Sequence, residues 1–478
     1  MQLKKIRKVE TMQITEQMEE TQTNESPIVV GLDIGTSKIA CIVAQRDRYG
    51  KLNVLGMGRA DTNGGVQRGE VYNIQTTTEA IKKAVEEAQK NSGVEIKVVY
   101  VGIAGQHITS RQNRGIYTLP AADSEITNQY VKDMIDDMHK LALEPGERII
   151  HVLPQEFVVD NNIKTKQPVG MYGSRLEADF HVITGKIAAA QNIKRCVERA
   201  GLQMLGLVLE PLASSASVLK AEEMEAGVAL VDIGGGTTDI AIFEDNIIRH
   251  TAVIPYAGDI VTQDIKKECQ VLRSQAEKLK VRFGCAIAQE AQDCEVITIQ
   301  GIAGHEKKDI SMRTLANIIQ CRMEEIFSAV NFEIRNSGLQ NNLIAGIVVT
   351  GGGSQMTHLK QLVEYVTGYQ ARIGYPTEHI ARGTKDEIKN PMYATGLGLI
   401  LKGYEVLAED AENRNNKKKV ERIVVEEKPQ EEAPKETFQQ METLDSKPDV
   451  KSEPWWKKVN KDIKNWFADT GVNKDFEN

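Results

Sequence analysis

The stretch VALVDIGGGTTDIAIF (residues 228–243) places an aspartate and three consecutive glycines between two apolar runs. Glycine packs nothing and is costly to order inside a strand, so three in a row indicate a strand that ends, turns and starts again. The arrangement is useful if another group must approach the backbone closely at the turn. We therefore interpret the stretch as a β-hairpin whose tip, Gly234-Gly235-Gly236, faces a ligand.

A second copy of this pattern lies near the start of the chain. In VVGLDIGTSKIACIVAQ (residues 29–45) an apolar run is again followed by Asp-Ile-Gly, small hydroxyl residues and another apolar run. Asp33-Ile34-Gly35 therefore matches Asp232-Ile233-Gly234. One copy alone is equally compatible with a purely structural glycine hairpin. Internal repetition of a loop rarely arises by accident, so two copies favour a shared ligand.

The residues of both turns are suited to binding phosphate. A hairpin tip made of small residues exposes successive backbone N–H groups, and a concave row of amides binds anions. Hydroxyl side chains add further donors, at Thr36, Ser37, Thr237 and Thr238. Lys38 adds a positive charge suited to phosphate oxygens. Asp33 and Asp232 would repel a polyphosphate unless Mg²⁺ lay between them, so we predict Mg²⁺ held through its water shell.

A third glycine cluster ends another apolar run. IAGIVVTGGGSQM (residues 344–356) indicates a buried strand that finishes at three glycines, and THLKQLVEYVTG continues as a helix with Thr357 as its N-cap. A strand, a glycine turn and a helix bring the backbone close to a nucleotide. The G-x-G-x-x-G spacing of dinucleotide sites is missing, and the sequence contains no P-loop motif.

Together these elements resemble the nucleotide-binding core of the actin superfamily, which includes actin, heat-shock chaperones and sugar kinases. The resemblance implies an α/β fold of two lobes that close on ATP and Mg²⁺. The two hairpins would clamp the phosphates, and the third glycine segment would lie against the adenosine. The cofactor-binding residues implied so far are Gly35, Thr36, Ser37, Lys38, Gly234, Gly235, Gly236, Thr237, Thr238, Gly351, Gly352 and Gly353.

Three further stretches resemble parts of the same superfamily. GLVLEPLASSASVL (residues 206–219) and YATGLGLIL (residues 393–401) resemble the two helices that connect the lobes. In the first of them, Glu210 stands where the family keeps the residue that orients the attacking water or the metal. In SQAEKLKVRFGCA, Glu277 and Lys280 have the family's E-x-x-K spacing, which implies contact with the ribose and the base.

Within the superfamily, the stretches GLDIGTSKIACIV, AEKLKVRFGCA and VTGGGSQM are most similar to the FtsA family of bacterial cell-division proteins. The resemblance implies a protein that binds ATP, polymerises on the inner face of the cell membrane and anchors the FtsZ ring there, at the division septum. It also implies two inserted subdomains: 1C, for filament contacts and later division proteins, and 2B, for the C-terminal peptide of FtsZ. Whether ATP is hydrolysed is left open by the sequence.

The chain divides into a core, two inserts and a tail. Residues 127–142 predict an amphipathic helix in the first insert, with its apolar face in a core. After residue 404 the chain is rich in Glu and Lys, which predicts a disordered tether. The predicted parts are a disordered arm at 1–26, lobe 1A at 27–107 and 182–226, subdomain 1C at 108–181, lobe 2A at 227–259 and 344–404, subdomain 2B at 260–343, a linker at 405–452 and an amphipathic helix at 453–478.

The last of these parts contains EPWWKKVNKDIKNWFADTG (residues 453–471). Its large apolar residues recur at helical spacing and form one stripe, which consists of Trp455, Trp456, Val459, Ile463, Trp466 and Phe467. Lys457 and Lys458 lie beside this stripe. A cationic helix with an aromatic face lies in a membrane interface and favours anionic lipid, but this one is too short to span a bilayer. The alternative is a helix that packs on its own protein or in a partner's groove.

Composition narrows the class of protein further. The net charge of −8 and the pI of about 5.7 argue against general nucleic-acid binding. The six cysteines have no C-x-x-C or paired spacing, which fits free thiols in a reducing cytoplasm and does not indicate zinc. The polar first 26 residues are not a signal peptide. Two alternatives stay open: another membrane-associated actin-like protein, of the pilus-assembly type, and an actin-fold small-molecule kinase.

Overall fold

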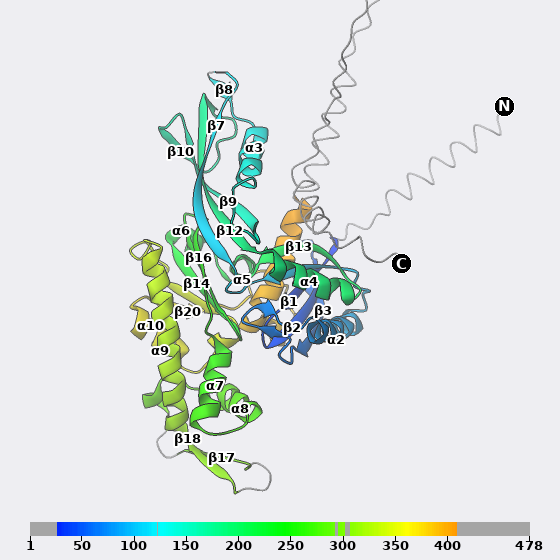
Figure 1. Ribbon diagram of the computed structural model, residues 1–478, viewed down its shortest axis with the longest axis vertical. Helices are drawn as coiled ribbons and strands as arrows, with labels where there is room; N and C mark the ends of the chain where they lie inside the picture. The colour runs from blue at the N-terminus through cyan, green and yellow to red at the C-terminus, as the bar shows by residue number, and fades with distance from the viewer. Residues whose placement is uncertain (1–25, 122, 292–294, 302–305, 409–478) are drawn as a thin grey trace, which may run out of the picture. The chain divides into compact units, whose positions relative to one another are not determined.

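Figure 1 shows a computed structural model of the chain, which describes residues 26–121, 123–291, 295–301 and 306–408. These residues form two compact units: one comprises 26–108 and 192–401, and the other comprises 109–191 and 402–408. The predicted amphipathic helix lies outside the described residues, as do the predicted arm up to residue 25 and the predicted linker beyond residue 408.

The first unit contains two five-stranded sheets. One is built from β1 (Ile28–Ile34), β2 (Lys38–Arg46), β3 (Leu52–Asp61), β6 (Val98–Ile103) and β13 (Gln203–Leu209). The other is built from β14 (Val228–Ile233), β15 (Thr238–Glu244), β16 (Ile247–Ile254), β19 (Ile347–Thr350) and β20 (Ala371–Ile373). Strands β1, β2, β14 and β15 are almost wholly buried, as expected for sheets covered on both faces.

The two sheets have the same topology. Their strand orders are β3-β2-β1-β6-β13 and β16-β15-β14-β19-β20. In each, three consecutive strands form an antiparallel meander, and two later strands add in parallel beside the first of them. The repeat seen in the sequence at two turns therefore extends to two whole sheets.

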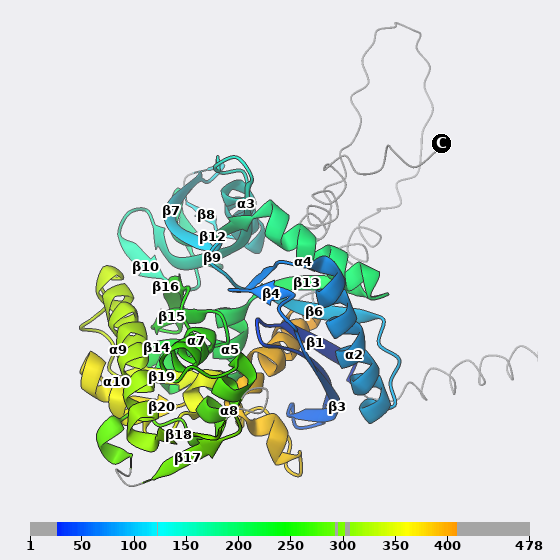
Figure 2. The same cartoon turned by 60° about the horizontal axis from the view of Figure 1, so that its bottom comes forward.

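Helices and short hairpins complete this unit. The helices are α2 (Ile74–Ser92), α4 (Ile187–Arg199), α5 (Glu210–Val218), α6 (Ala221–Ala226), α7 (Gly258–Glu268), α8 (Arg273–Phe283), α9 (Met312–Asn336) and α10 (Leu359–Thr367), with a last one over residues 394–408. The first five residues of α4 and the last seven of the final helix are grouped with the second unit. The hairpins are β4 (Val66–Gln67) with β5 (Glu70–Val71), and β17 (Val296–Ile299) with β18 (Lys308–Ser311). In Figure 2, α2 lies on one face of the first sheet and the last helix, in orange, on the other. Helix α10 starts after His358, so Thr357 is not its N-cap.

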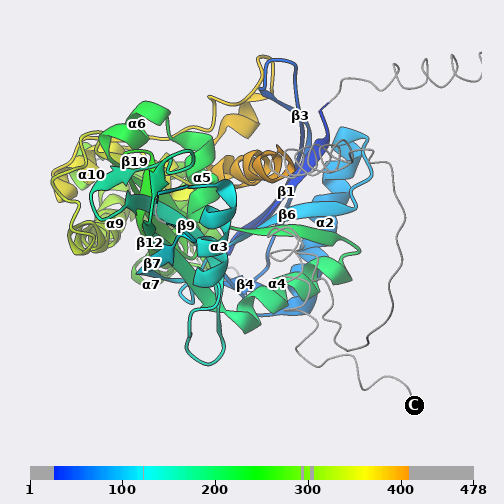
Figure 3. The same ribbon diagram turned by 90° about the horizontal axis from the view of Figure 1, so that it is seen from above.

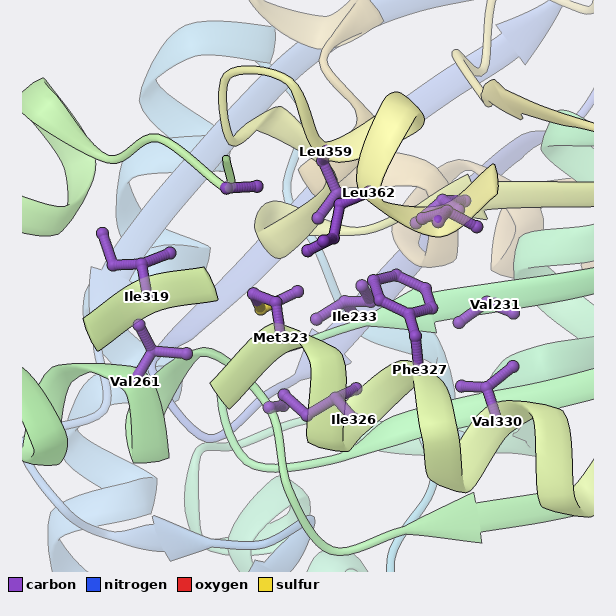
Figure 4. Packing of buried hydrophobic residues seen from close by; sticks show 14 of the residues in the cluster. Val231, Ile233, Val261, Ile319, Met323, Ile326, Phe327, Val330, Leu359 and Leu362 are labelled. Carbon is purple, nitrogen blue, oxygen red and sulfur yellow. The ribbon is translucent and has the colours of Figure 1, made fainter. Parts of the chain in front are cut away.

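A continuous apolar core joins α9 to the second sheet. Figure 4 shows Val231 and Ile233 of β14 facing Phe327 and Met323 of α9, and all four are buried. The first half of α9 reaches α7, where Ile319 belongs to the same cluster as Val261. We expected residues 260–343 to be an insert on the second lobe. The second half of α9 instead belongs to the core of that lobe.

The last helix packs closely on α5 and on the first sheet. A Cβ atom at Gly398 would lie 1.8 Å from the carbonyl oxygen of Ala213 in α5, so only glycine permits this approach. Gly31 of β1 leaves similar room for the backbone at Gly396. Figure 3 shows the helix, in orange, alongside β1. Our prediction gave all of residues 344–404 to the second lobe, and this helix is an exception because it covers the first sheet. It also continues to residue 408, four residues into the predicted linker.

The second unit is a small sheet with one helix. Its four-stranded sheet has the order β10-β9-β12-β7, from β7 (Thr109–Thr118), β9 (Glu147–Val159), β10 (Ile163–Thr165) and β12 (Arg175–Lys186). A shorter ladder pairs β8 (Ser124–Glu125) with β11 (Tyr172–Gly173), and α3 (Asn128–Met138) buries Met134 against the sheet. Pro154 lies beside an irregularity in the β9–β12 register, and β10 pairs with β9 only beyond it, which is where a strand tolerates proline.

The shared core predicts a contrast between two phenylalanines of α9. Phe327 is 0 % exposed and Phe332 is 62 % exposed. We expect Phe327→Ala to lower the free energy of unfolding by about 3–5 kcal/mol, because a cavity opens between α9 and β14, and Phe332→Ala to change it by less than about 0.5 kcal/mol. Denaturant unfolding of both variants measures the difference. Equal losses would contradict the placement of the second half of α9 in the lobe core.

Candidate functional site

A cleft of about 1410 Å³ opens in the first unit, at the tips of both sheets. Its walls come from the two hairpin turns, the third glycine segment, and α5, α7 and α8. Among the site residues predicted from the sequence, those that line it are Asp33, Gly35, Thr36, Ser37, Lys38, Glu210, Asp232, Gly234, Gly235, Gly236, Thr237, Glu277, Lys280, Gly351, Gly352 and Gly353. Segments far apart in the chain thus meet at one place.

The second hairpin turn has its carbonyl groups bonded to α7. The carbonyl oxygens of Gly234 and Gly235 accept hydrogen bonds from the backbone N–H of Gly258 and Asp259, at 3.1 and 2.7 Å. In a planar trans peptide the C=O of one residue points opposite to the N–H of the next. The N–H groups of Gly235 and Gly236 therefore point away from α7. The N-terminus of α7 orients this turn as an anion-binding site.

The first hairpin turn is built in the same way with different partners. Thr62 donates its Oγ1–H to the carbonyl oxygen of Gly35 at 3.0 Å, and its N–H to that of Ser37 at 3.2 Å. The N–H groups of Thr36 and Lys38 therefore point away from Thr62. In both turns the N–H of the leading glycine bonds to the carbonyl three residues on, at 3.0 Å from Gly35 and 2.9 Å from Gly234. The repeated motif thus has a repeated geometry.

The third glycine segment follows the same rule. Oγ of Ser354 donates a hydrogen bond to the carbonyl oxygen of Gly351 at 2.8 Å. The N–H of Gly352 therefore points the opposite way. Gly351 has φ of +82°, and a Cβ atom there would lie 2.3 Å from Oδ1 of Asp232. A Cβ atom at Gly353 would lie 2.4 Å from the side chain of Ile233. Both glycines are required because this segment packs directly on the end of β14.

The two hairpin turns also approach each other. A Cβ atom at Gly236 would lie 2.4 Å from Oγ1 of Thr36, and one at Gly235 would lie 2.9 Å from Oγ of Ser37. The backbone at Arg68, between β4 and β5, would lie 2.9 Å from a Cβ atom at Gly236. Side chains in the second turn would therefore push the two tips apart. The triple glycine allows one anion to contact amides from both sheets.

The two aspartates predicted as metal residues have different partners. Asp33 accepts from Nζ of Lys38 at 3.2 Å. Asp232 accepts from Oγ of Ser214 in α5 at 2.6 Å and from Oγ1 of Thr395 at 3.3 Å. Burial raises the pKa of Asp232, and the bond from Ser214 opposes this rise. Both carboxylates are thus held in place, Asp33 near the end of β1 and Asp232 near the end of β14.

Two further carboxyl groups face the same space. Glu210, at the start of α5, has its pKa raised well above the usual value by burial and by the nearby Asp33, Asp239 and Asp232. Gly102 of β6 leaves room for its side chain. Asp239 lines the cleft as well, and burial followed by the charge of Asp232 raises its pKa to about 8. Its Oδ1 is buried and has no hydrogen-bond partner among the described residues.

Glu277 and Lys280 lie together on the wall formed by α8. Nζ of Lys280 is 2.8 Å from Oε2 of Glu277 and also donates to the carbonyl oxygen of Gly258 at 2.9 Å. Thr262 of α7 donates to the same Glu277 oxygen at 2.5 Å. The E-x-x-K pair therefore ties α8 to α7 beside the second turn, with both side chains still reaching the cleft.

Thr238 does not line the cleft, so the structure gives no support to its predicted role. It is buried at the first position of β15, and its Oγ1 donates to the carbonyl oxygen of Tyr256. The hydroxyl of Thr237 reaches the cleft but donates to Asp239 at 3.0 Å. Asp239 itself was missed by sequence reasoning. The sequence could have indicated it, because a hairpin with a four-residue tip places Asp239 directly opposite Asp232.

Within the described ranges, no group of three or more His, Cys, Asp or Glu side chains is placed to hold a metal ion directly. The carboxylates of the cleft are therefore suited to a cation that keeps its own water ligands, which is the usual habit of Mg²⁺. In the same part of the chain, no helix combines the length and the apolar composition that crossing a membrane requires.

Comparison with known proteins gives the family. The family model of cell division protein FtsA matches residues 229–398, and that of the SHS2 domain inserted in FtsA matches residues 105–184. Cell division protein FtsA of Pseudomonas aeruginosa is 41 % identical over 79 % of this chain and 89 % of its own length. That of Escherichia coli strain K12 is 35 % identical over 80 % of this chain and 92 % of its own length. A solved type IV pilus biogenesis complex, PilM–PilN, has a TM-score of 0.58 at 16 % identity, covering 78 % of this chain and 98 % of that one.

The duplicated sheets, the shared cleft and the inserted small domain define an actin-like α/β protein, which confirms the fold class predicted from the sequence. Within that class, the chain belongs to the FtsA family of cell-division proteins. The likeness to the pilus complex shows the fold alone.

The pKa of Asp239 predicts how stability changes with pH. The folded state keeps this proton to about pH 8, whereas the unfolded chain releases it near the ordinary value of 3.8. The unfolded state therefore binds fewer protons between these values, and Asp239 lowers the free energy of unfolding as pH rises through the window. We expect nucleotide-free Asp239→Asn to gain stability over the parent by roughly 1 kcal/mol for each pH unit from 5 to 8.

Denaturant unfolding at four pH values tests this. Asp123→Asn is the matched control, since Asp123 is exposed and its φ of +63° suits asparagine equally well. Parallel pH profiles for parent and Asp239→Asn would show that Asp239 ionises normally.

Proposed function

We propose that the protein binds Mg²⁺–ATP in this cleft and serves as an adaptor that fixes the FtsZ polymer to the cell membrane during division. One observation carries the nucleotide part: two turns of the same construction, from two sheets of the same topology, present backbone N–H groups to a single cleft. A polyphosphate is the common ligand with enough negative charge and length to contact both turns.

The residues of the turns would bind the phosphates. The N–H groups after Gly35, Gly234 and Gly235 supply directed donors, and Lys38 supplies the positive charge. Gly351, Gly352 and Gly353 leave room for the adenosine beside β14. Glu277 and Lys280 would contact the ribose and base from α8. Because the ligand touches both sheets, its binding would hold the two lobes in one relative arrangement.

Mg²⁺ fits the donor set of this cleft through its water shell. Asp33 and Asp232 would accept hydrogen bonds from metal-bound water, and the partnerless Oδ1 of Asp239 offers a third acceptor. The metal would supply the positive charge that offsets the carboxylates and the phosphates together. Bound cation favours the ionised form of Asp239, so binding would release protons near neutral pH.

Slow turnover is the expected consequence of the environment of Glu210. A carboxyl group that orients and deprotonates water must be ionised, and burial with three neighbouring carboxylates favours its protonated form. Glu210 would orient water or the metal, with weak or no hydrolysis. An adaptor needs the bound nucleotide for its conformation and does not require rapid hydrolysis.

Membership of the FtsA family supports the adaptor part of the proposal. We propose that subdomain 2B, within 260–343, receives the C-terminal peptide of FtsZ, and that the inserted unit contacts later division proteins and neighbouring copies. The cationic aromatic segment at 453–471 would bind anionic lipid at the cytoplasmic face of the septum. Self-association would display many weak lipid-binding segments at once, which gives tight overall attachment.

Two alternatives remain to be compared by experiment. A pilus-assembly protein of this fold would not bind the FtsZ tail peptide, and a small-molecule kinase would transfer phosphate to a sugar or acid. A pull-down with the FtsZ tail peptide and a phosphotransfer assay on a panel of small substrates distinguish both from the adaptor.

A substitution between the two turns tests nucleotide binding. We expect Gly236→Val to weaken Mg²⁺–ATP binding at least about 100-fold, because its side chain would occupy the space at Thr36 and Arg68. Titration calorimetry on the purified chain measures the dissociation constants. Gly146→Asn is the control, since Gly146 has φ of +87° with open space around it, in the other unit. Unchanged binding by Gly236→Val would refute the clamp between the turns.

A second prediction concerns the lipid-binding segment. We expect Trp466→Glu, and deletion of residues 453–478, to abolish pelleting with vesicles that contain anionic lipid, because a charge replaces the aromatic anchor. Trp466→Phe should retain most of the pelleting, and nucleotide binding should be unchanged in all three variants. Vesicle binding that survives the deletion would place the membrane contact elsewhere in the chain.

A further inference from the structure

Lys38 has two partners in the first turn. Its Nζ lies 3.2 Å from Oδ2 of Asp33 and 5.1 Å from the ring centroid of Tyr393. The lysine side chain is only 12 % exposed, although it lines the cleft. An ammonium group within about 6 Å of an aromatic ring is attracted to the ring face. Lys38 is therefore shared between a carboxylate and a ring.

Tyr393 acts through its ring in this arrangement. The residue is 1 % exposed and is not among those that line the cleft, so a ligand there would touch Lys38 and not the tyrosine. Its hydroxyl group is buried without a hydrogen-bond partner among the described residues. The ring of Tyr393, and not its hydroxyl group, makes the cation–π contact with Nζ of Lys38.

The segment that carries Tyr393 is fixed at both ends. Before it, Nδ2 of Asn390 donates to Oε1 of Gln355 at 2.6 Å, next to the third glycine segment. After it, Oγ1 of Thr395 donates to Oδ2 of Asp232, at the second turn. The N–H of Tyr393 bonds to the carbonyl oxygen of Asn390 at 3.0 Å. The ring is thus held against the first turn by contacts with the other two glycine elements.

We propose that Tyr393 is a positioning residue for Lys38: its ring keeps the ammonium group at the mouth of the first turn, available to a phosphate in the cleft. A lysine has a flexible four-carbon stem. Without the ring, Lys38 would form a closer ion pair with Asp33, and that carboxylate would neutralise its charge. The ring face attracts the cation without neutralising it. This inference rests on the proposed binding of nucleotide phosphates.

The reading that Tyr393 is only a core residue makes a different prediction. Loss of a core ring would lower stability and would weaken the binding of any ligand of the cleft alike. Loss of Lys38 positioning weakens only ligands that carry phosphate. Adenosine, which has none, therefore separates the two readings.

The experiment measures binding of ATP, ADP and adenosine to the full chain at fixed Mg²⁺ concentration. The variants are Tyr393→Phe, Tyr393→Leu, Lys38→Met and the double variant Lys38→Met with Tyr393→Leu. We expect Tyr393→Phe to match the parent, and Tyr393→Leu to lose about tenfold in affinity for ATP and ADP with adenosine affinity unchanged. In the Lys38→Met background, Tyr393→Leu should cause no further loss. Equal losses for adenosine and ATP, or a further loss in the double variant, would overturn the inference.

A second measurement works on the nucleotide-free protein. Acylation of lysines, followed by mass spectrometry, gives the labelling rate of Lys38 itself. We expect Tyr393→Leu to change this rate several-fold and Tyr393→Phe to leave it unchanged, because the ring and not the hydroxyl contacts Nζ. Identical Lys38 rates in parent and Tyr393→Leu would refute the contact. A parent that binds no nucleotide would refute the proposed function, while the labelling result would still decide between the two roles of Tyr393.

Discussion

Carbonyl groups at three glycine turns are hydrogen-bonded back into the protein, and the cleft depends on this constraint. At the first turn the partner is Thr62, at the second it is the N-terminus of α7, and at the third it is Ser354. Because C=O and the next N–H point opposite ways in each peptide, every bond that fixes a carbonyl also directs an amide outward. Directed amides without their own acceptors bind anions. Glycine is needed at Gly235 and Gly236 of the second tip because they lie against Ser37 and Thr36 of the first.

The charges around the cleft favour the proposal that a cation binds together with the phosphates. Four carboxyl groups, of Asp33, Glu210, Asp232 and Asp239, face the same space as the outward amides. Burial and mutual repulsion raise the pKa of three of them, those of Glu210, Asp232 and Asp239. Protonation relieves the repulsion when no ligand is bound. A hydrated cation would relieve it without protons, and would at the same time attract the phosphates. The metal and the nucleotide are therefore expected to bind together.

Local patterns in the sequence predicted the cleft well, because each turn is encoded by consecutive residues. The Asp-Ile-Gly repeats and the triple glycines all line it, as do Glu210, Glu277 and Lys280. Thr238 is the exception, since the position after the tip already belongs to β15 and its hydroxyl bonds to Tyr256. What the sequence could not give is which sheet each amphipathic helix covers. Apolar periodicity marks a buried face and does not name its partner, so the packing of the second half of α9 and of the helix over 394–408 could not be predicted.

The two hairpins are not identical, and their differences make the two sides of the cleft chemically distinct. When the two hairpins are aligned by register, Lys38 is the last residue of the first tip and Thr237 is the equivalent residue of the second. The register also places Ala40 across from Asp33, where the second hairpin has Asp239 across from Asp232. The first turn thus carries the cation and the second carries the additional carboxylate. We propose that phosphate oxygens would be drawn toward the first turn and a hydrated cation toward the second, so a metal-bound polyphosphate would fit between them in one orientation better than in the reverse. The differences at Lys38/Thr237 and Ala40/Asp239 would therefore be sufficient to distinguish the two ends of such a ligand.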